Sequence, residues 1–223
     1  MIGSALAILA KDLRIETRTR EGLTSIVVLG VLLVLVFSVA HDPTPSEAPR
    51  LAPAVIWVTF TFTGLLAIQR SFVVEREQDC LAALLVGPLD PAALYVGKLL
   101  GNVILLAAMQ AMVLPLTALL LHVELAGALP GLIVVLLLGN LGFAALATLF
   151  GAVAVRVRAR EVLLPVLLLP LLVPVLVGGV KATAAVLAGE GLAGATQAIG
   201  MLGAFDVIFT TAGVLLFEQV VRD

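Results

Sequence analysis

Three ionisable residues of this chain lie where a mostly apolar sequence could use them for chemistry: Asp206, His41 and His122. Asp206 lies inside the last apolar stretch, where a carboxyl group lines a translocation path, relays a proton or pairs with a basic group of another helix. His41 and His122 end apolar stretches, so they are either haem-contact candidates or interfacial polar residues. No second ligand lies near either histidine at helical spacing, and we predict no metal site and no catalytic residue.

The sequence carries no nucleotide-binding motif. A phosphate-binding loop needs Gly, four residues, then Gly-Lys-Ser/Thr. The Gly-Lys pair at 97–98 does not fit, because Ala92 replaces the first Gly and Leu99 replaces the Ser/Thr. The segment 189–194 matches GxGxxG but follows no predicted strand, so we do not interpret it as a dinucleotide site. We predict no nucleic-acid partner, and any ATP hydrolysis must occur on a separate subunit.

The segment from Arg70 to Lys98 has the charges best placed to contact a partner protein. A charged run at 75–79 precedes leucines at helical spacing, which predicts an amphipathic helix over 72–86 that ends at 87–88. Such a helix either docks into a soluble ATPase subunit or lies flat on lipid. We expect docking, through Arg70, Glu75, Arg76, Glu77, Asp79, Leu81, Leu84 and Pro88.

Six apolar stretches must position these residues. A bilayer core about 30 Å thick needs roughly 20 apolar residues per helix, and backbone groups in lipid must pair within their own segment. With 61% hydrophobic and 13% charged residues, the chain is predicted to be all-α, with one transmembrane domain over 1–223. The predicted spans are 22–40, 51–69, 99–121, 131–155, 162–180 and 199–217.

Basic residues are distributed unequally between the segments that separate these spans. Eleven of the 13 Lys and Arg residues fall in alternate segments, which predicts that those segments and both termini face the cytoplasm. Acidic residues precede the first stretch, so we expect an uncleaved anchor and not a signal peptide. The single cysteine, Cys80, excludes an internal disulfide.

Sequence patterns in the segments next to the spans predict further helices. Residues 2–20 are predicted to form an interfacial amphipathic helix, the alternative being a solvated tail. Its apolar stripe is Ile2, Leu6, Leu9 and Leu13. Asp90 and Pro91 suit the cap and first turn of the helix that leads into the third span. The outer stretch 181–198 is rich in Ala and Gly, which favours a re-entrant or interfacial helix at 182–188.

Polar and small residues inside the spans predict contacts between helices. Asn102, Gln110 and Asn140 are expected to form interhelical hydrogen bonds, and Gly139 with Gly142 to permit close helix approach. Three prolines in the fifth span and one in the third are expected to bend those helices. They are Pro165, Pro170 and Pro174, and Pro115.

Taken together, these features resemble the CcmB family, the permease subunit of the cytochrome c maturation ATP-binding-cassette system. The resemblance is carried by the inner-loop pattern from Arg70 to Lys98, by Leu168-Leu169-Pro170-Leu171, and by Ala204-Phe205-Asp206. It covers essentially the whole chain. Relatives usually have Gly and Glu where this chain has Asp79 and Ala82, which leaves Glu75 and Glu77 as the charged candidates for ATPase contact.

The resemblance implies an ABC-2-type permease in the bacterial inner membrane. Its expected partners are an ABC ATPase subunit, haem-handling membrane subunits, a periplasmic haem chaperone and a second permease half, such as a second copy of this chain. ATP would bind the partner, and haem would be a transported ligand with no resident cofactor here. The resemblance leaves open whether haem crosses this subunit or ATP hydrolysis releases the loaded chaperone.

Three other functions are alternatives for a chain with this sequence. The same architecture serves ABC-2 permeases for lipid, glycan or peptide. A membrane-embedded enzyme would need facing acids, histidines or a metal set within the spans. An assembly scaffold would need no coupling helix.

Overall fold

The computed structural model describes residues 8–10, 20–41, 43–44, 46–77, 91–154 and 160–222. Regular structure in these ranges is entirely helical, and six helices are long and apolar enough to cross a membrane. This confirms the predicted fold class. The long helices are α2 (Arg20–His41), α3 (Ala48–Glu77), α5 (Pro91–Leu121), α6 (Leu129–Ala154), α7 (Arg160–Leu187) and α9 (Thr196–Arg222), and the short α8 (Gly191–Gly194) precedes α9.

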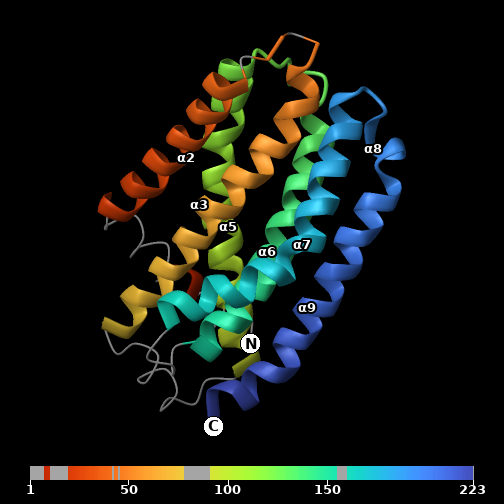
Figure 1. Ribbon diagram of the computed structural model, residues 1–223. Coiled ribbons are helices and arrows are strands. Elements are labelled where there is room, and N and C mark those ends of the chain that lie inside the picture. Colours follow the sequence, from red (N-terminus) through yellow and green to blue (C-terminus); the bar gives the residue numbers. More distant parts are fainter. Residues whose placement is uncertain are drawn as a thin grey trace.

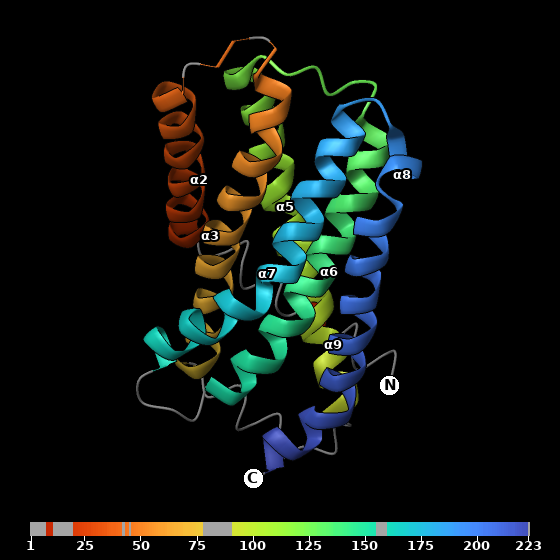
Figure 2. The ribbon, with the colours of Figure 1, turned by 45° about the vertical axis from the view of Figure 1, so that its right-hand side comes forward.

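The six long helices form an up-and-down bundle (Figure 1). The end of α3, the start of α5, the end of α6, the start of α7 and the end of α9 lie at the same end of the bundle, the lower end in Figures 1 and 2. Among the described residues, five Lys and Arg residues belong to the helix turns at this end, namely Arg70, Arg76, Lys98, Arg160 and Arg222, whereas Arg50 and Lys181 lie towards the opposite end. We therefore call it the basic end, and the opposite end the outer end.

Helices α3 and α6 form the centre of the bundle. In each of them, 72% of the hydrophobic membrane-spanning stretch is buried inside the protein, against 17% in α2 and 22% in α9. α6 packs against α5, α7 and α9, while α3 packs against α2, α5 and α7. Since apolar side chains gain little from leaving lipid for protein, close packing between these helices is the main source of cohesion.

A local cap fixes the start of α3 at the outer end. The Glu47 carboxylate accepts hydrogen bonds from the Thr44 hydroxyl at 2.7 Å and from the Thr44 backbone N–H at 3.1 Å. These hydrogen bonds lower the pKa of Glu47. The Ala48 N–H donates to the Thr44 carbonyl, which begins the helical hydrogen-bond pattern.

The prediction of a re-entrant or interfacial helix at 182–188 is wrong in making it an element of its own: residues 182–187 are helical, but they continue α7, which runs without a break to Leu187. The alanines of this segment favour helix, and the glycine pair before it, 178–179, is occupied in packing and does not break the helix. The helix ends at Gly189, which has φ +83°. The Gly189 N–H donates to Val186 and the Glu190 N–H to Ala185, a Schellman ending.

The prolines of the fifth span lie inside one helix. α7 contains Pro165, Pro170 and Pro174 without interruption, and Figures 1 and 2 show that its first half runs obliquely to its second half. A proline removes one backbone donor and crowds the preceding turn, so a bend is the expected consequence. α5 likewise continues through Pro115.

The inner loop begins later than expected. α3 runs unbroken to Glu77, so residues 72–77 continue the second membrane helix and do not start a separate one at 72. The rest of the predicted coupling helix lies outside the described residues. α5 begins at Pro91 as predicted. Of the predicted helix 2–20 the structure describes 8–10, which are helical, and Arg20, where α2 begins; Ile8 is buried in the main core.

Candidate functional site

A single tryptophan joins α3, α6 and α7. Trp57 of α3 is fully buried, and its indole Nε1 donates a hydrogen bond to the Thr183 hydroxyl of α7 at 2.9 Å. Gly139 of α6 and Gly179 of α7 lie against the indole ring, so closely that a Cβ atom at either position would overlap it. These four residues make a slot, here called the Trp57 slot, that holds α3, α6 and α7 in one register.

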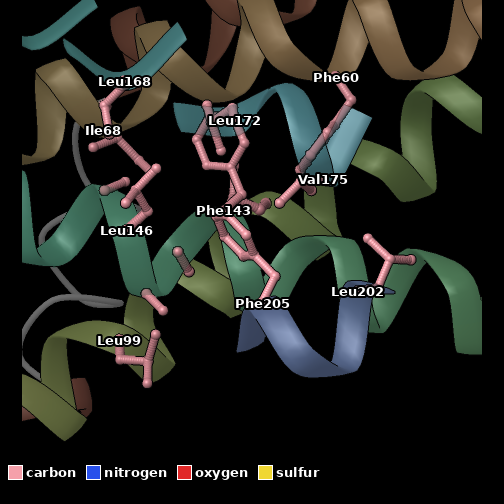
Figure 3. Close-up of a cluster of buried hydrophobic side chains, with 14 of the residues drawn as sticks. Phe60, Ile68, Leu99, Phe143, Leu146, Leu168, Leu172, Val175, Leu202 and Phe205 are labelled. Atoms are coloured by element: carbon pink, nitrogen blue, oxygen red, sulfur yellow. The ribbon is translucent and has the colours of Figure 1, made fainter. Parts of the chain in front are cut away.

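An aromatic series continues from the Trp57 slot towards α9. The Trp57 and Phe60 rings meet edge to face with centroids 5.5 Å apart, and Phe60 and Phe143 do so at 5.2 Å. Figure 3 shows Phe60, Phe143 and Phe205 in one cluster with the leucines of α6 and α7. Such edge contacts add to packing where no hydrophobic drive exists between helices.

Tyr95 makes the corresponding connection towards the basic end. It is fully buried on α5, and its hydroxyl is within hydrogen-bond distance of the Ala145 carbonyl of α6 at 3.2 Å and the Phe209 carbonyl of α9 at 3.4 Å. Gly213 gives the ring room on α9, and Phe217 packs beside it with centroids 5.4 Å apart. α5, α6 and α9 are thus held at one point.

The predicted interhelical hydrogen bonds are confirmed in one case. The Asn102 amide donates to the Thr148 hydroxyl at 2.8 Å and joins α5 to α6. Lys98, one turn earlier, is only 4% exposed, so its charged group lies inside the protein. Gln110 Nε2 and Asn140 Oδ1 are buried and have no hydrogen-bond partner within the described ranges.

Asp206 is the buried acid of the site. Its side chain is 5% exposed, and neither carboxyl oxygen has a hydrogen-bond partner among the residues that the structure describes. A Cβ atom at Gly142 of α6 would lie 2.6 Å from Oδ1, so the close approach predicted for Gly142 is where the acid sits. The Thr210 hydroxyl, one turn along α9, is also buried and has no hydrogen-bond partner among the described residues. An unsatisfied carboxyl at such a place is costly, which favours a functional role.

The two histidines are separate from this site. His41 is the exposed last residue of α2 and stacks on Phe37 with ring centroids 6.1 Å apart. His122 follows α5 with φ +55°, and the next residue, Val123, donates its N–H to the Ala118 carbonyl. This places His122 at the left-handed position of a helix ending. Among the described residues, no three metal-ligating side chains gather.

His122→Gly should therefore preserve function. Glycine suits a left-handed position better than any other residue, so we expect unchanged or slightly higher thermal stability. The test is the amount of c-type cytochrome in cells that carry only the variant, beside His122→Val as a control that strains the same backbone. A loss of cytochrome in the glycine variant at normal protein level would instead assign the imidazole to haem contact.

The predicted coupling residues divide between described and undescribed segments. Arg70, Glu75, Arg76 and Glu77 belong to the last turns of α3. Asp79, Leu81, Leu84 and Pro88 lie outside the described residues. The charged inner loop thus begins on the same continuous helix that carries Trp57, a connection that the sequence alone did not reveal.

An apolar hollow of about 200 Å³ lies between α2, α3 and α5. It is lined by Ile26, Val27, Gly30, Val31, Thr63, Met109, Met112, Val113 and Leu116. Its volume is below the roughly 300–1,000 Å³ of typical ligand pockets. The polar groups described above do not line it.

Comparison with known proteins places this geometry in context. The family model described as CcmB protein matches residues 3–222. Heme exporter protein B of Paracoccus denitrificans is 31% identical over 79% of this chain and 80% of its own length. The proteins of the same name from Rhodobacter capsulatus and Pseudomonas aeruginosa are 30% and 28% identical, over 78% and 82% of this chain and 80% and 81% of their own lengths.

Proposed function

The chain belongs to the CcmB protein family and is a membrane component of the haem export system for cytochrome c maturation, and from this premise we propose that it is the permease subunit of an ATP-binding-cassette transporter. The observation that carries the proposal is the family match over 3–222 on a bundle of six membrane-spanning helices. ATP is bound and hydrolysed on a partner subunit. The chain lies in the inner membrane with its basic end in the cytoplasm.

The coupling path runs along α3. This helix is continuous from Ala48 to Glu77, so a force applied at its charged end reaches the Trp57 slot without a hinge. At the slot, the Trp57–Thr183 hydrogen bond and the two facing glycines transmit a shift of α3 to α7 and α6. ATP closure of the partner thereby biases two arrangements of the bundle, which requires docking that differs between them.

A second permease half, such as a second copy of this chain, completes the transporter. The most exposed span is α2, in which 17% of the hydrophobic membrane-spanning stretch is buried inside the protein, followed by α9 with 22%. Their outward faces are available to lipid, to a second copy and to haem-handling subunits. The continuity of α3 with the inner loop favours mechanical work, the release of a haem-loaded chaperone, as the step that ATP drives.

Cells that lack this gene should lose covalently bound haem from all c-type cytochromes. The wild-type gene should restore it, and Leu84→Asp should not, because a charge in an apolar docking contact weakens association with the ATPase. The measurements are a haem stain of membrane proteins and co-purification of the ATPase with tagged protein. Leu84→Met is the control, since it keeps volume and apolarity.

Normal cytochromes in the deletion strain, in the absence of a second copy or another maturation route, would refute the proposed role. Full ATPase co-purification with Leu84→Asp would refute the docking assignment alone.

A further inference from the structure

A second hollow, here called the outer hollow, lies at the outer end between α7 and α9. Its volume is about 250 Å³. Figures 1 and 2 both show the ends of α7 and α9 beside α8 at this place. The hollow is lined by Val177, Lys181, Gly194, Ala195, Gln197, Ala198 and Met201.

The outer hollow lies near the outer ends of two helices that are long and apolar enough to cross a membrane. Lys181 precedes the end of α7 by six residues, about 9 Å at 1.5 Å per residue. Gln197 is the second residue of α9. Val177, one turn before Lys181, is 42% exposed, so this face of α7 looks out of the bundle. A lysine at this depth extends its ammonium group towards the interface.

The chemistry of the outer hollow is that of an anion site. The Lys181 ammonium has three donors and the Gln197 amide has two. The lining contains no acid, and Lys181 is exposed without an ion pair to any residue that the structure describes. The acid that borders the hollow is Glu190, whose side chain lies against Gly194. Its charge weakens anion binding without occupying the space.

We propose that the outer hollow binds an anionic oxygen group on an apolar molecule that lies in the outer leaflet. The group is the phosphate of a phospholipid or a carboxylate of haem, and the haem source rests on the proposed function. The volume of about 250 Å³ is below the roughly 300–1,000 Å³ of a whole-ligand pocket, so the hollow suits the charged group alone. The apolar body then lies along Val177 and Met201.

The phospholipid source is tested with the full chain in nanodiscs of phosphatidylcholine mixed with phosphatidylglycerol. Native mass spectrometry measures how much of each lipid stays bound. Lys181→Gln should lower the retention of phosphatidylglycerol relative to phosphatidylcholine about tenfold, as expected for one charge-assisted hydrogen bond. Lys181→Arg should keep it, and Glu190→Gln should raise it. Arg50→Gln removes the other Lys or Arg side chain that the structure describes at the outer end, and we expect no change from it.

The haem source is tested in nanodiscs of phosphatidylcholine alone. Hemin should bind the wild type, and both Lys181→Gln and esterification of hemin to its dimethyl ester should weaken binding about tenfold. A response of either probe to Lys181→Gln supports the site and identifies its source. Unchanged phosphatidylglycerol retention together with unchanged hemin binding would overturn it. A deletion strain with normal cytochromes would refute the proposed function and leave the phosphatidylglycerol test valid.

Discussion

Gly139→Leu should remove the folded protein from the membrane. A Cβ atom at this position overlaps the Trp57 ring, whose movement is restricted because Gly179 lies against the same ring and the Thr183 hydroxyl accepts a hydrogen bond from its nitrogen. Protein interiors do not yield to such overlap without moving helices, and we expect a loss of about 3 kcal/mol of stability. Because α3, α6 and α7 meet at this ring, the damage spreads to the centre of the bundle.

The measurement is fluorescence-detected size-exclusion chromatography of detergent extracts, combined with thermal melting. Gly200→Leu is the matched control, because a Cβ atom at Gly200 of α9 meets no other atom within 4 Å. That variant should give a normal monodisperse peak and, as leucine favours helix over glycine, equal or higher stability. A normal peak and melting temperature for Gly139→Leu would show that the Trp57 slot does not hold the central helices together.

The spans could be predicted from the sequence because each depends on a local property. An apolar run long enough to cross a bilayer must be helical whatever its neighbours do, and all six predicted spans are found. Local sequence signals also indicate where α5 starts, at Pro91, and where α3 starts. Thr44 and Glu47 have the spacing of a capping box, which is visible in the sequence as T-x-x-E.

The Trp57 slot could not be predicted, because it depends on residues far apart in the chain. Gly139 and Gly179 lie 40 positions from each other and face the same ring. In a single sequence, a glycine is equally consistent with a helix end, a bend or the close approach of two helices. Distant contacts also explain the error at 182–188. The Ala- and Gly-rich composition of 181–198 was interpreted by itself, whereas the pair 178–179 packs against Trp57 and α9, and α7 continues past it.

Asp206 could be singled out from the sequence as an acid inside a span, but its surroundings could not. Three roles were open, and a basic partner was one of them. The structure gives the carboxyl no hydrogen-bond partner in the described part of the chain and sets it against Gly142. A buried carboxyl group without a partner in that part of the chain lowers stability, which favours a role of Asp206 in transport.

Asp206→Asn should therefore leave the fold intact and abolish function. The amide has nearly the same shape and cannot carry a negative charge or exchange a proton, so we expect equal or higher thermal stability with at least about a tenfold loss of c-type cytochrome. The two readouts are melting of the purified protein and the haem stain of cells that carry only the variant. A purely structural acid would move both together.

Thr59→Val is the matched control for this prediction. Thr59 is fully buried on α3, and its hydroxyl also has no hydrogen-bond partner among the described residues. Valine has the same shape, so its stability should not fall and its cytochrome level should stay normal. If Asp206→Asn behaved like Thr59→Val, the carboxyl would have no part in transport. If it instead unfolded the protein, the acid would have a structural partner beyond the described residues, and the functional assignment would fail.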